Sequence, residues 1–328
     1  MYQQFYGLQE LPFELTPNPK CLFLTRRHRE ALSNLQYGLF SAKAITVLIG
    51  EAGTGKTTLL HTALESPPCR NVTCVYLNNP TLTRTEFVEI LSNRFNLGPH
   101  VSESKARLLE ELDGVLRERR ARGQITALVI DEAQSLSREL LEEIRLLANI
   151  ETSTEKLLPL VLAGQPELRD RLNEPGLRQL KQRVALRCEI VPFSQEETAA
   201  YIAHRLRAAG ADASKLFTRE AVMLVHQKSG GIPRVINVMC DNALVTGYGL
   251  ERRPVDRDIV VEVARDFDLG GEPLDSKPSS GPVATVAAVA AVETVENDTL
   301  PAQTLEDERP LFAASAGNRR RFSLFRGR

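Results

Sequence analysis

The segment GEAGTGKT at residues 50–57 constrains the fold of this chain more than any other stretch. It fits the pattern G-x-x-x-x-G-K-[ST], which binds phosphate only when a strand precedes it and a helix follows it. Here the apolar run AITVLI precedes it and the helical stretch TTLLHTAL follows. Glycines let backbone N–H groups turn toward an anion, and the helix N-terminus adds its positive dipole end. The order of strand, loop and helix therefore predicts a phosphate site rather than a chance Gly-rich turn.

Each residue of this loop has a predicted part in binding ATP and Mg²⁺. Lys56 is placed to neutralise the β- and γ-phosphates, and the Thr57 hydroxyl is placed to ligate the metal ion. The other residues expected around the phosphates are Gly50, Glu51, Ala52, Gly53, Thr54, Gly55 and Thr58.

The run ALVIDEAQ delivers two acids to the C-terminal end of a predicted strand. Ligands bind at this edge of a parallel sheet. We therefore expect Asp131 to orient Mg²⁺ and Glu132 to polarise the attacking water as a general base. The alternative is that Asp131 serves only as a helix N-cap, a position that suits aspartate.

Two polar residues further along the chain are candidates for sensing the γ-phosphate. Gln165 ends the apolar run LPLVLAGQ and could reach the phosphate or the attacking water. Arg234 follows Pro233 in the first turn of a predicted helix and could swing over the phosphates. The alternatives are a loop residue without a contact for Gln165 and a surface arginine for Arg234.

The segment LRDRLNEPGLRQLKQRVALRCEI carries a series of arginines. Arg178, Arg183 and Arg187 lie four or five residues apart. An arginine that reaches into a neighbouring subunit's site would stabilise charge in the transition state. The alternative is that these arginines are solvated charges on a helix, and the sequence does not decide which one would act.

Strands that alternate with helices predict an α/β fold with a parallel sheet covered by helices on both faces. The strand-like runs are AITVLIG, VTCVYLN, ITALVI and LLPLVLAG, and only helical patterns follow Pro192. We predict an N-terminal lead-in at 1–40, a nucleotide-binding domain at 41–192, a helical lid at 193–268 and a disordered tail at 269–328, whose composition is rich in Pro, Ser, Ala, Thr and Glu.

Composition narrows the class of protein and its partners. The net charge of −1 among 328 residues does not favour nucleic acid or membrane as an electrostatic partner of the whole protein. The start lacks the pattern of a signal peptide, and no run approaches the ~20 apolar residues that cross a bilayer. We therefore expect a cytoplasmic protein without a membrane span. Its cysteines form no Cys-x-x-Cys pair and are interpreted as reduced, buried thiols: Cys21, Cys69, Cys74, Cys188 and Cys240.

The chain ends in NRRRFSLFRGR, a basic and aromatic stretch. Its charged and aromatic residues are Arg319, Arg320, Arg321, Phe322, Phe325 and Arg326. Such a tag could dock on anionic lipid, nucleic acid or an acidic partner. Through it the protein would attach peripherally to the inner membrane; the alternative is a plain solvated tail.

Several motifs occur together as they do in one known family: FYGLQELPFELTPNP, VLIGEAGTGKTTLL, VIDEAQSL, LVLAGQPEL, LRQLKQRV and GGIPRVIN. Over residues 1–268 the chain resembles the AAA+ ATPases of general secretion pathway protein A. The resemblance implies a Walker A role for Lys56 and Thr57 and a Walker B role for Asp131 and Glu132. It also implies the first sensor at Gln165, the second at Arg234, the trans-acting finger at Arg183, and Pro12 with Phe13 near the adenine.

Secretion members of this family continue into a transmembrane helix and a peptidoglycan-binding domain, and this sequence shows neither. We expect hydrolysis of ATP to ADP and phosphate by an ATP-dependent homo-oligomer, in the service of an envelope, secretion or polysaccharide-export assembly. One alternative is a DNA-dependent ATPase that assists transposition, which the near-neutral charge disfavours. Another is an ATP-switched scaffold with little turnover, against which the presence of Glu132 argues.

Overall fold

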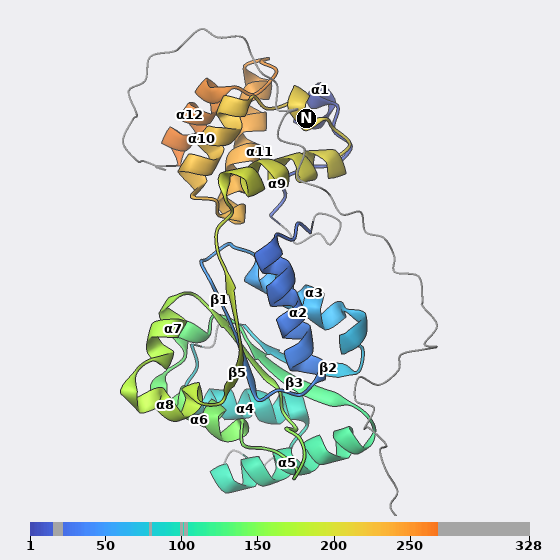
Figure 1. Ribbon diagram of the computed structural model, residues 1–328, viewed down its shortest axis with the longest axis vertical. Coiled ribbons are helices and arrows are strands. Elements are labelled where there is room, and N and C mark those ends of the chain that lie inside the picture. Colours follow the sequence, from blue (N-terminus) through green and yellow to red (C-terminus); the bar gives the residue numbers. More distant parts are fainter. Residues whose placement is uncertain (16–21, 79–80, 99–100, 102–103, 268–328) are drawn as a thin grey trace, which may run out of the picture. The chain divides into compact units, whose positions relative to one another are not determined.

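The computed structural model describes residues 1–15, 22–78, 81–98, 101 and 104–267 (Figure 1). The predicted disordered tail, its basic and aromatic end and Cys21 lie outside these residues. The cysteines within them are free thiols; three are buried, whereas Cys74 is partly exposed.

The N-terminal two thirds of the chain are built around a five-stranded parallel sheet. The strand order is β2-β3-β4-β1-β5. The strands are β1 Ile45–Gly50, β2 Val72–Leu77, β3 Ile125–Ile130, β4 Leu160–Gly164 and β5 Val184–Ile190. The three inner strands are buried along their whole length, as a parallel sheet covered on both faces requires. The predicted α/β sheet is therefore confirmed.

Strand β5 corrects the helical interpretation of the arginine-rich segment. Arg187 lies within β5 and Arg183 directly precedes it, whereas Arg178 begins the short helix α8. Every second residue of the edge strand β5 is exposed, so one face of this strand is open to solvent. Its sequence VALRCEI therefore lacks the continuous apolar run that marks the inner strands.

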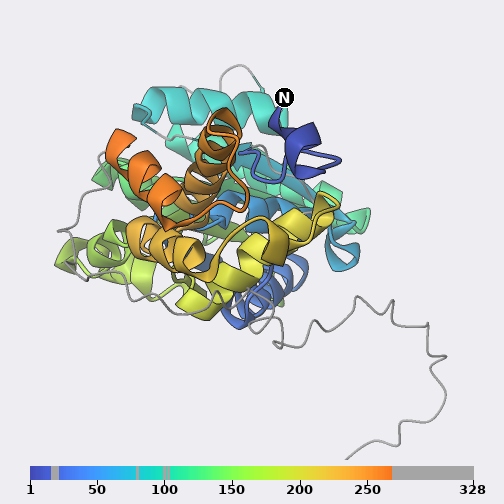
Figure 2. The same cartoon turned by 90° about the horizontal axis from the view of Figure 1, so that it is seen from above.

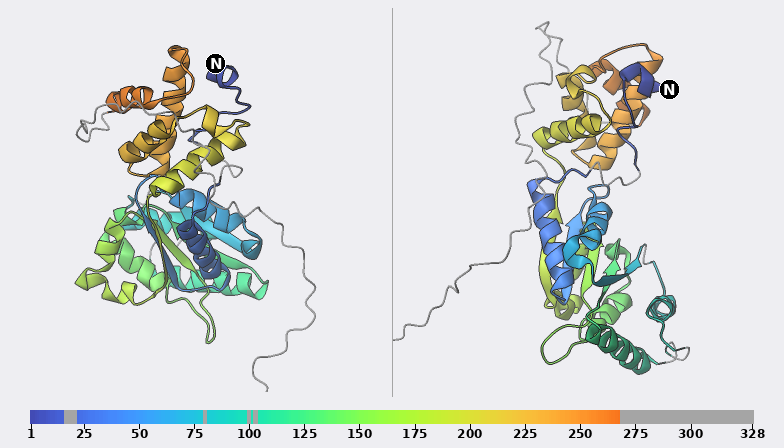
Figure 3. Two further views of the ribbon diagram at one scale, coloured as in Figure 1. Left: turned by 45° about the horizontal axis from the view of Figure 1, so that its top comes forward. Right: turned by 90° about the vertical axis from the view of Figure 1, so that its right-hand side faces the viewer.

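Helices cover both faces of the sheet (Figures 1 and 3). One face is covered by α2 Arg26–Phe40 and α3 Lys56–Glu65, followed by the 3₁₀ turn η2 Pro67–Cys69. The other face is covered by α4 Arg84–Phe95, α5 Lys105–Ala121, α6 Arg138–Leu147, α7 Glu167–Leu172 and α8 Arg178–Lys181, with the 3₁₀ turns η4 Ala133–Ser135 and η5 Pro175–Leu177. Alternate strand residues supply the two cores: Leu128 and Ile130 of β3 face α4 to α8, while Ala127 and Val129 face α2 and α3.

A second, all-helical part follows β5 (Figure 2). It contains α9 Gln195–Ala208, η6 Ala213–Lys215, α10 Arg219–Ser229, α11 Pro233–Gly249 and α12 Arg257–Asp266. Helix α9 begins with a capping box, in which Ser194 and Glu197 satisfy each other's backbone N–H groups. Among the residues described, no helix is both long and apolar enough to cross a bilayer.

The predicted lead-in at 1–40 divides between the two parts of the structure. Helix α1 Tyr2–Tyr6 and Phe13 pack into the apolar core of the helical part. The buried guanidinium of Arg205 in α9 donates to the carbonyls of Pro12 and Glu14. Helix α2, by contrast, packs on the sheet. The start of the chain therefore belongs structurally with the helices that follow β5.

Candidate active site

The phosphate loop connects the buried end of β1 to the first turn of α3. Gly53 and Gly55 have φ values of 81° and 98°, which L residues with a side chain rarely adopt. A side chain at Gly50 would also bring Cβ to 2.9 Å from the Ile190 carbonyl of β5. Glu51 and Ala52 are exposed in the loop, and Thr58 lies in the first turn of α3. The sequence pattern thus has a steric cause in this structure.

Lys56 is 5% exposed, and its ammonium lies at the base of the loop. It donates to the carbonyls of Gly50 at 2.8 Å and Glu51 at 3.1 Å. Burial lowers the pKa of Lys56, and the nearby carboxylates of Glu132 and Asp131 offset part of that effect. An ammonium has three N–H donors, so one is left over from these two bonds for a phosphate oxygen.

Thr57 and Asp131, which the sequence separates by 74 positions, meet at the end of the sheet. The Thr57 hydroxyl donates to Asp131 Oδ2 at 2.7 Å. Asp131 is 2% exposed, and its Oδ1 accepts the backbone N–H of Glu132 at 2.9 Å. This contact places a hydroxyl and a carboxylate, both hard oxygen ligands, beside the N-terminus of α3.

Tyr76 of β2 is part of this site, although the sequence analysis did not single it out. Its hydroxyl donates to the same Asp131 Oδ2 at 2.8 Å, and its ring stacks on His61 of α3. Burial, followed by the hydrogen bond and the charge of Asp131, raises the pKa of Tyr76, so the hydroxyl remains a donor at neutral pH. The alternation of side chains along β2 could have identified Tyr76 as facing α3.

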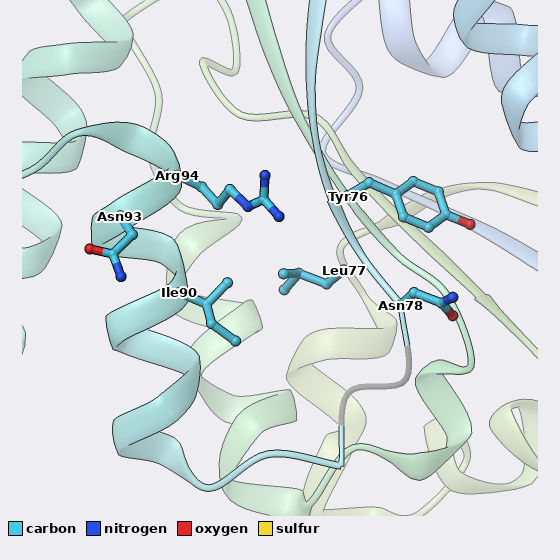
Figure 4. Close-up of a pocket in the computed structure, with 6 residues that line it drawn as sticks. All are labelled: Tyr76, Leu77, Asn78, Ile90, Asn93 and Arg94. Atoms are coloured by element: carbon cyan, nitrogen blue, oxygen red, sulfur yellow. The ribbon is translucent and has the colours of Figure 1, made fainter.

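Figure 4 shows the opposite side of the same strand. Leu77 points toward Ile90 of α4, with Arg94 beside them, while the Tyr76 ring extends to the other side of β2. A cavity of about 420 Å³ lies here, lined by Tyr76, Leu77, Asn78, Ile90, Asn93 and Arg94. None of the residues that line this cavity belongs to the phosphate loop.

Glu132 and Gln165 come together at the adjacent ends of β3 and β4. Gln165 Nε2 donates to Glu132 Oε2 at 3.2 Å. The same oxygen accepts Nε2 of Gln134 at 2.6 Å, and Oε1 of Gln134 accepts the backbone N–H of Gln165 at 3.1 Å. Gln134 was not among the sequence candidates; its position two residues after the acid, at the start of a turn, is the only signal that the sequence carries.

The loop is also contacted from α2 and from α11. The backbone N–H of Arg234 donates to the Gly53 carbonyl at 3.2 Å, and a Cβ at Gly53 would lie 2.8 Å from Arg234 Cβ. His28 Nε2 bonds the next carbonyl, that of Thr54, at 3.3 Å. Since a carbonyl only accepts, Nε2 carries the proton. Burial is the largest influence on His28 and lowers its pKa, against the opposing effects of the Thr54 carbonyl and Glu197.

Arg183 lies away from the loop of its own chain. Arg183 directly precedes Val184, which pairs with Ile45 at the start of β1, whereas the phosphate loop follows the end of β1. The strand between them spans about 20 Å, so Arg183 does not reach its own loop; its guanidinium donates to Asn149 Oδ1 at 2.8 Å. Phe13 is 1% exposed and packs against Phe217, and the adenine position expected for Pro12 and Phe13 stays a prediction.

The donor set fits a magnesium ion held jointly with phosphate. Within the described parts of the chain, no three His, Cys, Asp or Glu side chains gather into a metal site of their own. Mg²⁺ usually keeps several waters and takes only one or two protein ligands together with substrate phosphates. Thr57 and Asp131 supply such a pair.

Comparison with known proteins agrees with this geometry. A family model described as an AAA domain matches residues 40–172. This segment is therefore similar to an AAA domain. General secretion pathway protein A of Aeromonas hydrophila is 42% identical over 250 residues, which are 76% of this chain and 45% of that protein. The expected resemblance is confirmed, and the chain spans less than half the length of this relative.

Solved structures share the fold of the AAA domain and its following helices. Cdc6p from Pyrobaculum aerophilum matches with a TM-score of 0.59 and 17% identity, covering 78% of this chain and 70% of that one. The ORC1 protein of Aeropyrum pernix, in complex with DNA, matches with a TM-score of 0.57 and 18% identity, covering 78% and 69%. At such identities the likeness shows the AAA+ fold alone.

Proposed function

We propose that this protein hydrolyses ATP to ADP and phosphate with the help of Mg²⁺. The observation that carries the proposal is the 2.7 Å contact between the Thr57 hydroxyl of the phosphate loop and the Asp131 carboxylate of β3. It brings the phosphate loop and an acidic side chain to one point at the end of a parallel sheet. Glu132, the next residue, is the candidate base for the attacking water.

Different residues of this chain have different roles in the proposed reaction. The loop N–H groups and Lys56 hold the β- and γ-phosphates, and Thr57 with Asp131 would hold the metal ion. When bound, Mg²⁺ neutralises charge on the phosphates. Glu132 takes a proton from water while the water oxygen bonds to the γ-phosphorus and the bond to the ADP oxygen breaks. Gln165 is proposed to orient that water, and its hydrogen bond to Glu132 supports this role.

Arg183 is proposed to act in a neighbouring copy of the chain. Its place at the far end of the sheet from its own loop supports a role in trans rather than in cis. Arg234 is proposed to follow the phosphates, since its backbone already bonds Gly53 of the loop. These two arginines would link hydrolysis to assembly and to movement of the helical part, the predicted lid.

A secretion-related role is proposed for the assembly that this ATPase serves. The support is the similarity to general secretion pathway protein A over 76% of this chain. We propose that the protein works on the cytoplasmic side of the inner membrane and contacts an envelope or secretion protein there.

Phosphate release by the wild type, Lys56→Ala and Glu132→Gln tests the hydrolysis. The wild type should exceed Glu132→Gln by about 100-fold or more, since general bases contribute on the order of 10²–10⁴-fold. Lys56→Ala should also be slower than the wild type, because it lacks the ammonium that holds the phosphates. Equal rates in all three proteins would contradict the proposal.

Mixing two inactive variants tests the action of Arg183 in trans. Lys56→Ala lacks a working loop and Arg183→Ala lacks the finger, so each should be inactive alone. In a mixture, the Arg183 of a Lys56→Ala subunit can meet the intact loop of its neighbour and restore part of the activity. Arg187→Ala is the matched control and should remain active by itself. A mixture as inactive as its components would refute the trans arrangement.

A further inference from the structure

We propose that Gln134 is a positioning residue that holds Glu132 in place for its role as the general base. The inference rests on the proposed hydrolysis, because it assigns a partner to the base of that reaction. It is carried by the side-chain amide of Gln134, which joins the carboxylate of Glu132 to the backbone of Gln165.

The orientation of the Gln134 amide follows from its two partners. Its Oε1 accepts the backbone N–H of Gln165, which can only donate. Its Nε2 must then face Glu132, whose Oε2 it bonds at 2.6 Å. One amide therefore ties the end of β3 to the end of β4, and it holds both the base and the neighbouring amide that faces the base.

The backbone conformation of Glu132 also indicates that its surroundings fix its position. Glu132 has φ 53° and ψ 37°, a left-handed conformation that residues other than glycine seldom adopt. Such conformations persist where the surroundings determine them strongly. Here the turn directs the carboxylate of Glu132 and the amide of Gln134 toward each other. The Gln134 carbonyl is held in turn by the guanidinium of Arg171 in α7.

The hydrogen bonds also distinguish the two oxygens of the base. Both amides, from Gln134 and Gln165, donate to Oε2 of Glu132. Among the residues that the structure describes, no hydrogen bond reaches Oε1. We therefore assign Oε1 as the atom that accepts the proton from water, with Oε2 as the fixed end of the carboxylate.

Gln134→Met tests the proposal, because methionine keeps the length of the side chain and removes both amide groups. We expect kcat to fall about 10- to 100-fold, the rate equivalent of a hydrogen bond to a charged group. KM for ATP and the affinity for a fluorescent ADP analogue should change less than about twofold, since the side-chain hydrogen bonds of Gln134 among the described residues go to Glu132 and Gln165 and not to the phosphate loop. Gln134→Asn, whose amide is one methylene shorter, should show the same loss of kcat with a polar side chain retained.

A matched control is Gln124→Met, at an exposed glutamine just before the other end of β3. It should leave kcat unchanged, and the melting temperatures of all variants show whether they fold. If Gln134→Met does not fold, Gln134→Asn carries the test.

A double mutant separates action through Glu132 from any other effect. In a Glu132→Gln background, adding Gln134→Met should lower the single-turnover rate by no more than about twofold. The same 10- to 100-fold loss in both backgrounds would overturn the proposal, as would wild-type kcat in Gln134→Met. Equal phosphate release by the wild type and Glu132→Gln would contradict the proposed hydrolysis itself, which is a different result from those that would overturn the role of Gln134.

Discussion

Replacing Gly231 with alanine should destabilise the protein by roughly 3–4 kcal/mol, whereas the same change at neighbouring Gly230 should cost only about 1 kcal/mol. Both glycines have positive φ, 59° for Gly230 and 75° for Gly231, so both share the penalty for a left-handed residue with a side chain. They differ in their surroundings. A Cβ at Gly230 would meet nothing within 4 Å, while at Gly231 it would lie 2.1 Å from the backbone oxygen of Phe193.

The magnitude follows from these contacts. A left-handed alanine costs about 1–2 kcal/mol, and the stiffer unfolded chain returns about 0.4–1 kcal/mol, which leaves about 1 kcal/mol at Gly230. At Gly231 the Phe193 backbone must also move by more than 1 Å, on the order of the gap between the clash and ordinary contact. That movement breaks the 2.8 Å bond from Phe193 N–H to the Gly231 carbonyl and disturbs a ring that is 4% exposed. A lost hydrogen bond and overpacking add roughly 2–3 kcal/mol.

Thermal unfolding of the two variants is the assay. At about 2–4 °C per kcal/mol for a protein of this size, Gly230→Ala should lower the melting temperature by roughly 2–4 °C and Gly231→Ala by roughly 6–16 °C. Equal shifts in the two variants would refute the reasoning, because they would show that the backbone conformation, and not the contact with Phe193, dominates at both positions.

Two further predictions concern the hydrogen bonds of buried carboxylates. Tyr76→Phe removes the donor to Asp131 Oδ2 and should raise the Mg²⁺ concentration for half-maximal ATPase activity about 10-fold or more, as loss of a partner of a metal ligand does. A magnesium titration measures this concentration, with Tyr37→Phe on α2 as the control. An unchanged midpoint would contradict the prediction. Glu143 of α6 is 8% exposed and is paired with Arg84 at 2.8 Å and Lys105 at 2.9 Å. Burial raises its pKa, but these two partners outweigh burial and the net pKa is lowered. Stability from a lowered carboxylate pKa is present above the unfolded value of about 4.3 and is lost as pH falls through the folded value. Glu143→Gln should therefore lower the free energy of unfolding in urea by about 1 kcal/mol at pH 7 and by nearly nothing at about pH 3. The effect is small because Arg84 and Lys105 are partly exposed. An equal loss at both pH values would count against the ion pairs.

The sequence was sufficient for those parts of the site that a local pattern specifies. The phosphate loop depends on glycine conformations and on its place between a strand and a helix. A short stretch of consecutive residues specifies both. Asp131 and Glu132 follow a continuous apolar run, which marks an inner parallel strand. The four predicted strands, β1 to β4, share such apolar runs. The segments after Pro192 show the periodicity of helices.

What escaped prediction depends on contacts between distant residues. One face of strand β5 is open to solvent, so its exposed Arg187 and Glu189 interrupt the apolar pattern. Tyr76 reaches Asp131 only because β2 lies next to β3, and strand order is not visible in the sequence. In the sequence, Gln134 is an ordinary turn residue. Its contacts with Glu132 and Gln165 depend on the ends of β3 and β4 lying side by side. The separation of Arg183 from its own loop likewise follows from the pairing of β5 with β1.

The support of the phosphate loop has a consequence for dissecting this protein. Two successive loop carbonyls are bonded by His28 and by Arg234, and Gly50 pairs with Ile190 of β5. All three supports lie outside the residues 40–172 that match the AAA family model. A fragment cut to that match would keep the whole nucleotide motif but lose an edge of the sheet and both braces of the loop. The smallest piece able to bind nucleotide on its own is therefore expected to run from before His28 to beyond Arg234, well past the limits of the motif that defines it.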